Sequence, residues 1–295
     1  LIGEERDTIL TLIDLFMAAI SLSITIKLSI DTPEKLKKYK FVFTVISIFL
    51  AIAVAVSAIR FWMTYYYNDS DVVVEESSAA ENAILQTGKF VTFGAYEQDC
   101  IQSNGKETIE WLVLDIQEDK ALLLSRYALD SQPYNTEYGT TTWEDCSLHS
   151  WLKDAFLENA FSAEELEIIR LTEVDNSKSQ NNKDWDVAGC KNTDDMIFLL
   201  SYADTDRYFD NEAARICTPT DYAVSMGADV RTLDDGITDA AWWWLRSPGE
   251  TSSQASFVNF DGTRYTNAVG NEYLSVRPAL WIDLDKYLSY IDTQQ

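Results

Sequence analysis

The sequence predicts an α+β domain that follows a two-helix membrane hairpin. Two long apolar stretches within residues 1–67 predict the hairpin. From Gly88 onward, strand-like segments, turns and amphipathic helical segments follow one another without a regular β-α-β alternation, which favours an α+β domain of short antiparallel strands with two or three helices. The chain has 295 residues, of which 46% are hydrophobic, and this is enough to build a sizeable core.

The charge is distributed unevenly along the chain. Residues 1–70 contain seven acidic and seven basic residues, so the rest holds 41 of the 48 acids but only 16 of the 23 bases and carries the whole net charge of −25. A field of this sign repels phosphate backbones, so nucleic acid is not an expected partner. A well-solvated surface is the ordinary structural meaning of such a charge.

The stretch from Phe41 to Ile59 contains 19 residues and no charge. At a rise of about 1.5 Å per residue, it nearly covers a hydrocarbon core of about 30 Å. Aromatic residues between Phe61 and Tyr67 follow at once, as in an interfacial belt. We therefore predict a membrane span over residues 41–62, with a buried core helix as the alternative.

A second span is predicted over residues 9–30. Asp14 and Lys27 lie near its ends, where such side chains can reach the headgroups, and an amphipathic helix lying in the interface is the alternative. The loop 31–40 between the two spans contains four lysines, which favours the cytosolic side. We therefore expect a location in the cell membrane with the C-terminal domain extracellular, lipid contacts through residues 9–62, and a hairpin able to mediate oligomerisation.

The remaining chain divides into an acidic stalk over 68–87, a folded domain over 88–288 and a tail over 289–295. Strands are expected over 89–96, 109–116 and 120–125 because of their β-branched and alternating apolar residues. A helix is expected over 142–156 because apolar residues recur at the spacing of one helical face. The residues of that face are Leu148, Trp151, Leu152, Ala155 and Phe156.

Two further helices are indicated by their caps. Ser162 and Glu165 have the spacing of a capping box at the start of one helix. Thr218 is the expected N-cap of the other, with Pro219 in its first turn and Gly227 just past its end.

Residues typical of catalysis or metal binding are sparse. His149 is the only histidine, and nucleophilic triads or zinc sites need further partners at set spacing, so we expect a structural or surface role for it. The four cysteines form no CxxC pair; outside the cell they permit three disulfide connectivities, and for Cys146 and Cys217 burial as small apolar residues is the alternative. These cysteines are Cys100, Cys146, Cys190 and Cys217. We expect neither a cofactor nor a metal site.

The segment AWWWLRSPG, residues 241–249, is the most distinctive in the chain. In an extended strand Trp242 and Trp244 face one side and Trp243 faces the other. We expect Trp242 and Trp244 to lie in the core. Downstream, Asp261 and Gly262 predict a hairpin turn.

Nine ordered segments, among them GKFVTFGAYEQD, TPTDYA, WWLRSPG and VRPALWIDL, give the chain a resemblance to a known family. It is similar to a bacterial extracellular domain family of unknown function, common in membrane-anchored proteins of gut Firmicutes, over roughly Gly88 to Leu284. The resemblance implies a C-type-lectin-like fold, shared with formylglycine-generating enzymes and the variable proteins of diversity-generating retroelements. His149 departs from the family, where arginine is expected. No cysteine follows Cys217, so the copper-binding cysteine pair of formylglycine-generating enzymes has no counterpart here.

In that fold the terminal strands and the loops between them form the binding face, as the resemblance implies. Aromatic rings there would stack on a sugar or a peptide side chain, and arginine with asparagine or aspartate would supply directional hydrogen bonds. The candidate ligand-binding residues are Trp243, Arg246, Asn259, Asp261, Arg264 and Tyr265. A purely structural role is the alternative for Arg246 and for Arg277. The polar loop 175–193 around Trp185 is the alternative site.

We therefore predict a membrane-anchored, non-catalytic cell-surface domain that binds a carbohydrate or protein ligand. One alternative is an enzyme, either of the formylglycine-generating-enzyme-like superfamily with divergent chemistry or a hydrolase with paired acids. The other alternative is a structural or assembly module.

Overall fold

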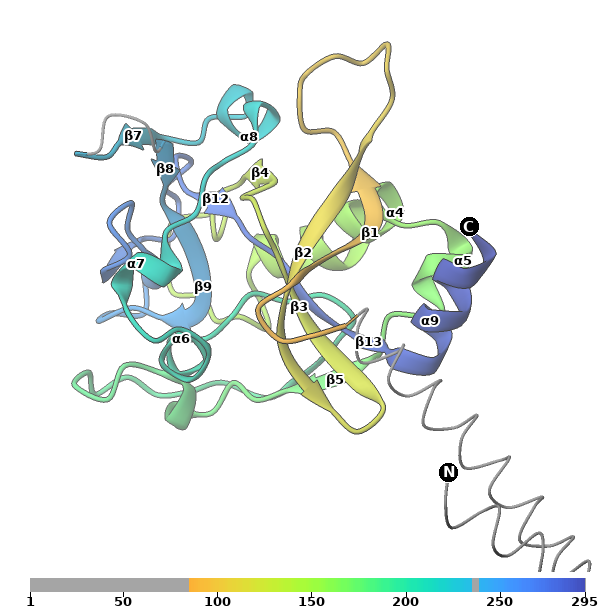
Figure 1. The fold of residues 1–295 in the computed structure, drawn as a ribbon. Helices are drawn as coiled ribbons and strands as arrows, with labels where there is room; N and C mark the ends of the chain where they lie inside the picture. The colour runs from red at the N-terminus through yellow and green to blue at the C-terminus, as the bar shows by residue number, and fades with distance from the viewer. Residues whose placement is uncertain (1–84, 235–238, 295) are drawn as a thin grey trace, which may run out of the picture. The chain divides into compact units, whose positions relative to one another are not determined.

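A four-stranded antiparallel sheet is built around the long, twisted β2–β3 hairpin (Figure 1). In spatial order its strands are β1 (Phe90–Tyr96), β2 (Glu107–Gln117), β3 (Lys120–Ser125) and β13 (Ala279–Asp283). The two-residue turn between β2 and β3 places Glu118 at a φ of 46°. The three strands expected over 89–96, 109–116 and 120–125 are confirmed. The computed structural model that shows them describes residues 85–234 and 239–294.

A second sheet has five strands. In spatial order they are β11 (Arg264–Ala268), β10 (Gln254–Val258), β9 (Trp243–Pro248), β12 (Ser275–Val276) and β4 (Asp130–Ser131). Its neighbours are antiparallel except for β9 and β12, which run parallel. The β10–β11 connection contains the expected turn, with Gly262 at a φ of 83°. The chain then leaves β12 through Arg277 and Pro278 and enters the first sheet as β13.

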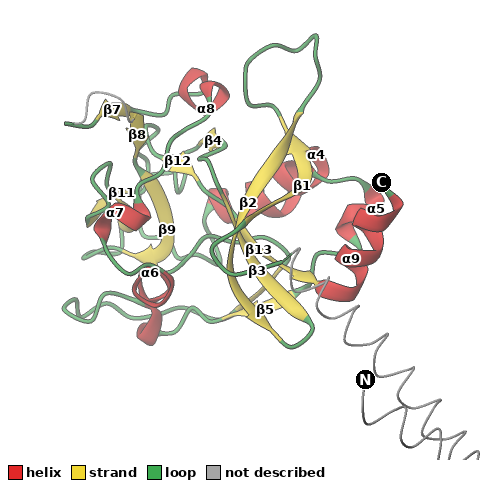
Figure 2. Ribbon diagram, viewed as in Figure 1, coloured by secondary structure: helices red, strands yellow, loops and turns green. Residues whose placement is uncertain are grey.

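Short elements complete the described part of the domain, and the helices lie around the strands (Figure 2). Two small antiparallel ladders pair β5 (Thr172–Val174) with β6 (Thr193–Asp195) and β7 (Val230–Thr232) with β8 (Asp239–Ala241). The helices are α3 (Ser147–Trp151), η2 (Leu152–Phe156), α4 (Leu157–Ala160), α5 (Ala163–Leu166), η3 (Lys178–Gln180), α6 (Tyr202–Tyr208), α7 (Glu212–Arg215), α8 (Asp221–Ser225) and α9 (Leu284–Thr293). Residues 289–293 of the expected tail therefore belong to a helix.

The helix expected over 142–156 begins later and runs on further. Cys146 is its N-cap, and α3, η2 and α4 continue without a break to Ala160. The middle section, η2, is a π-helix, and the wider turn shifts the apolar face by one residue. Phe156 is buried as expected, whereas Ala155 is exposed.

The two predicted caps have different outcomes. The capping box of Ser162 and Glu165 is confirmed at the start of α5. The N-cap of α8 is Thr220, not Thr218, because Pro219 forms a β-bridge with Ala128 and the helix begins only after it.

The predicted fold class is wrong. Over the described residues, curled antiparallel sheets dominate and most helices span one or two turns, unlike the predicted α+β, C-type-lectin-like arrangement with two or three helices. Tertiary pairing limits the helices: α5 ends at Leu166, and three residues later Ile169 forms a bridge with Ile282. Caps indicate where a helix starts, but they do not show how soon a distant strand ends it.

The predicted two-helix membrane hairpin is also corrected. Within residues 85–234 and 239–294, no helix is long and apolar enough to cross a membrane. The stretches 9–30 and 41–62 and most of the expected stalk lie outside the described residues. The described residues give no support to the transmembrane hairpin or to the cell-membrane location that depended on it.

Candidate functional site

The tryptophan segment forms β9, which has a neighbouring strand on each side. Trp244 is fully buried, as expected, and its indole N–H donates to the carbonyl oxygen of Gln132 at 3.0 Å. Trp243, expected to contact a ligand, is also fully buried, and its N–H donates to the carbonyl oxygen of Arg215 at 3.1 Å. Trp242 is only partly buried. Trp243 is therefore a core residue, because the face of β9 that was expected to be open is covered.

Arg246 is buried, with 5% of its surface exposed. Its Nη1 lies 2.6 Å from Asp204 Oδ2 and 2.9 Å from the carbonyl oxygen of Leu199. Its Nε and Nη2 donate to Asn176 Oδ1 and to the carbonyl oxygen of Asp175. These hydrogen bonds join β9 to the segments around it. Arg246 therefore has the structural role that was the alternative to ligand binding.

The other four predicted residues come together at the β10–β11 turn. Asn259 and Asp261 hydrogen-bond to the hydroxyl of Thr263 and hold the turn. Arg264 lies 2.7 Å from Asp206 Oδ1. Tyr265 is exposed to solvent over 55% of its surface. None of the six predicted residues lines the concave site described next.

Three loops enclose a pocket of about 330 Å³, which we call the three-loop pocket. Its size is within the usual range for small-molecule sites. The first loop contributes Tyr134 and Thr140–Trp143, the second Asp186–Cys190, and the third, which joins β9 to β10, contributes Pro248, Glu250–Ser252 and Gln254. The tryptophan segment thus leads directly into one wall of the pocket.

Hydrogen bonds hold the walls of the three-loop pocket in place. The Thr141 N–H donates to the carbonyl oxygen of Ser252 at 3.1 Å, and the hydroxyls of Thr140 and Ser252 lie 3.1 Å apart. At the floor, the Tyr134 hydroxyl donates to the carbonyl oxygen of Arg246 at 2.9 Å. Burial raises the pKa of Tyr134, so this hydroxyl remains a donor. Arg246 therefore supports the pocket from behind without lining it.

The charged side chains that line the pocket are acidic. Asp186 forms an ion pair with Lys178 at 2.6 Å, and the hydrogen bond and charge of this lysine hold the pKa of Asp186 below its usual value. Glu250 is exposed. The described lining contains no lysine or arginine. The pocket therefore disfavours phosphate or sulfate groups and suits neutral or cationic polar ligands.

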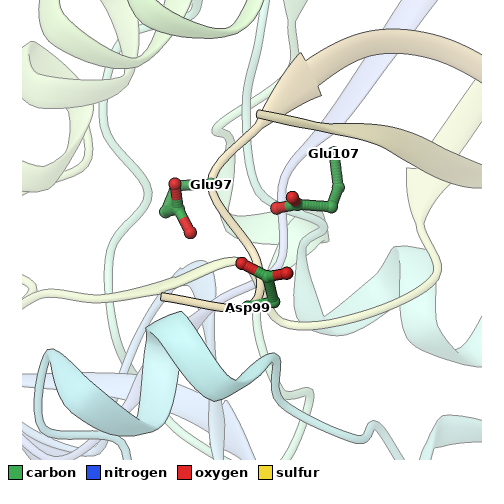
Figure 3. A group of neighbouring side chains, drawn as sticks. All are labelled: Glu97, Asp99 and Glu107. Carbon is green, nitrogen blue, oxygen red and sulfur yellow. The ribbon is translucent and has the colours of Figure 1, made fainter. Parts of the chain in front are cut away.

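A separate group of three carboxylates lies where β1 ends and β2 begins (Figure 3). Glu97, Asp99 and Glu107 each bring one oxygen within 4.8 Å of the others, an arrangement that can hold a hard cation. The loop itself already uses two of these groups. Asp99 accepts from the N–H of Ile101 at 2.7 Å, and Glu107 accepts from the N–H of Gln98 at 2.7 Å.

All four cysteines are free thiols, so the disulfide alternative does not hold, and the burial expected as the other alternative is found at Cys146 and Cys217. Cys146 and Cys217 are buried, Cys190 lies at the edge of the three-loop pocket, and Cys100 is exposed. Burial raises the pKa of Cys146 to about 12, so this thiol is not reactive at neutral pH.

Pattern analysis pointed to one wall of the pocket, because residues 186–190 lie within the polar loop 175–193 that was the alternative site, but it missed the other two walls. Their signal is modest: two hydroxyl-rich segments, TTTW at 140–143 and GETSSQ at 249–254, flank tryptophans and turns. Nothing in either segment indicates that the other lies opposite.

Residues 118–284 match a family model described as a domain of unknown function (DUF6273). Because the match covers more than half of the 295 residues, the chain belongs to this family. No curated protein and no solved structure matches the chain.

Proposed function

We propose that this member of the DUF6273 family is a non-catalytic binding domain that takes a carbohydrate into the three-loop pocket. The lining of the pocket is the main support. Hydroxyl groups of Thr140, Thr141, Thr251 and Ser252, together with the Gln254 amide, surround a concave site. Such groups both donate and accept hydrogen bonds, as sugar hydroxyls do.

The floor and the charge of the pocket favour the same class of ligand. Tyr134 and Trp143 also line the pocket, and although only 2% of each residue is exposed, their ring edges add an apolar contact that suits the apolar side of a sugar ring. Asp186 and Glu250 can accept hydrogen bonds from sugar hydroxyls but repel anionic substituents. A neutral or amino sugar therefore fits better than a sulfated or phosphorylated one.

Binding without hydrolysis fits the acids of the pocket. A glycosidase needs a carboxylic acid that stays protonated near neutral pH, facing a second carboxylate. Asp186 has its pKa held down by Lys178, and Glu250 is exposed at the rim. Neither carboxylate is buried in the apolar environment that such a general acid needs.

The test is binding by the full chain to an array that carries both glycans and peptides, followed by calorimetry with the glycans retained. We expect Gln254→Ala and Glu250→Gln each to weaken glycan binding about tenfold, because each removes one polar contact. Gln102→Ala and Glu158→Gln, which change exposed residues outside the pocket, are the matched controls and should bind as the unmodified chain does. Retention of peptides alone, or glycan affinities that both pocket variants leave unchanged, would overturn the proposal.

A further inference from the structure

Arg277 carries a buried charge where the chain crosses from the five-stranded to the four-stranded sheet. Only 4% of its surface is exposed. Its Nε donates to the carbonyl oxygen of Ser125 on β3 at 2.9 Å, which joins the two sheets. Its Nη1 is fully buried and has no hydrogen-bond partner among the described residues. A buried donor without a partner is costly, so such an atom points to a missing ligand.

A second buried polar atom of this kind lies two residues earlier. Ser275 is completely buried, and its hydroxyl oxygen also has no partner within the described chain. Ser275 begins β12, and Arg277 follows directly after this two-residue strand. Ser275 is the register partner of Trp243, and the Arg277 guanidinium carbon lies 5.0 Å from the centre of a Trp243 ring. The two unpartnered groups therefore both lie next to Trp243.

The charge of Arg277 is not balanced by a neighbouring acid. None of the ion pairs found among the described residues includes it. The Trp243 ring attracts a cation but carries no net charge. The nearby Cys217 thiol cannot balance the charge of Arg277, because burial raises the pKa of the thiol and keeps it neutral. Burial lowers the pKa of Arg277, but the ordinary pKa of a guanidinium is so high that the group stays charged at neutral pH.

We propose that this crossover binds a small monovalent anion of the halide class, chloride in ordinary buffers, through Arg277 Nη1 and Ser275 Oγ. A water molecule would satisfy the two hydrogen bonds but would leave the buried charge uncompensated. Because both residues are almost wholly buried, we expect a small anion there and not sulfate or a larger one. The bound anion would neutralise the junction at which the two sheets are joined.

The test is thermal unfolding of the full chain at constant ionic strength while gluconate is replaced stepwise by chloride. A ligand that binds only the native state raises the midpoint with its concentration, so we expect the midpoint to rise with chloride and with bromide. Sulfate stabilises proteins by exclusion from their surface, so any rise that it causes should be the same in Ser275→Ala. Ser275→Ala should weaken the apparent chloride affinity about tenfold, and Arg277→Met should abolish the response. Ser256→Ala, another fully buried serine of the same sheet, and Cys217→Ser should keep it.

A direct measurement is the chlorine-35 NMR line width. We expect the full chain to broaden the chloride signal, Ser275→Ala to remove most of this broadening and Ser256→Ala to retain it. This comparison tests chloride binding at the crossover even if Arg277→Met does not fold. Equal midpoints in chloride and gluconate without broadening would show that water alone occupies the crossover. A chloride response that survives Ser275→Ala unchanged would place the anion elsewhere. Either result overturns the proposal.

Discussion

His149 Nε2 lies 2.7 Å from Asp195 Oδ1 in the interior of the domain. The other ring nitrogen, Nδ1, faces the carbonyl oxygen of Glu144 at 3.3 Å, and the ring packs on Trp143. The carboxylate also accepts hydrogen bonds from Trp143 and Thr193, so it links α3 to the β5–β6 ladder. Because both ring nitrogens have hydrogen-bond partners, His149 has a structural role. This agrees with the sequence, in which it is the only histidine.

The Asp195 carboxylate makes stability depend on pH. Burial raises its pKa, but hydrogen bonds from His149 and Thr193, the charge of His149 and a hydrogen bond from Trp143 outweigh burial, so the pKa is lowered. A carboxyl group with a lowered pKa stabilises the fold above its unfolded pKa of about 3.9, and this contribution disappears as the pH falls through the folded pKa.

We expect Asp195→Asn to lower the free energy of unfolding by about 3–5 kcal/mol at pH 7, because it breaks a buried pair. The difference from the unmodified chain should shrink as the pH falls below about 4. Urea unfolding at several pH values measures both. A difference that stays constant with pH would contradict the role assigned to this carboxylate.

Trp244→Ala should lower the free energy of unfolding by about 3–5 kcal/mol, as truncation of a core aromatic residue does. Trp244 is fully buried and packs against Tyr134 and Phe257. Trp185→Ala is the control, because Trp185 is only partly buried and contacts Tyr202 edge to face; it should cost about 1 kcal/mol. Chemical denaturation compares the two, and equal losses would mean that Trp244 does not belong to the core.

Arg246→Met should destabilise the domain by about 3 kcal/mol, because it leaves Asp204 and two backbone carbonyls without their donor. Arg246→Lys should recover only part of this loss, since an ammonium cannot reproduce the planar fork. Arg126→Met removes an ion pair in which the Arg126 side chain is 41% exposed, and it should leave the melting temperature nearly unchanged. If Arg246→Met melts like the unmodified chain, the arginine is not structural, and its role as a ligand contact would be restored.

Gly262→Ala and Gly105→Ala form a matched pair. Both glycines have positive φ, 83° and 88°, so alanine at either position is strained by about 1–2 kcal/mol. At Gly262 the added methyl group would also collide with the backbone of Glu212, whereas nothing lies within 4 Å at Gly105. We therefore expect the Gly262 variant to lose clearly more stability in thermal melting. Equal losses would show that α7 does not approach this turn as the structure has it.

The sequence by itself determined features set by neighbouring residues. The strands of the β2–β3 hairpin, the Asp261–Gly262 turn and the capping box of Ser162 and Glu165 were all predicted where the structure has them. Each depends on side-chain alternation, on backbone freedom at one glycine, or on a hydrogen bond across three residues. Such interactions are the same whatever the remainder of the chain does.

Only the tertiary structure decided which faces of these elements are covered and which loops meet. Trp243 is buried because Arg215 and Arg277 lie over it, and Arg246 is anchored by Asn176, 70 positions away along the chain. The helices are short where the residues that follow a helix pair with a distant strand, as Ile169 does with Ile282 after α5. The three-loop pocket combines segments near residues 140, 188 and 251, and only the second of them, within the loop 175–193, was a candidate site from the sequence alone. Burial and concavity result from contacts between segments far apart in the chain, and local periodicity contains no record of those contacts.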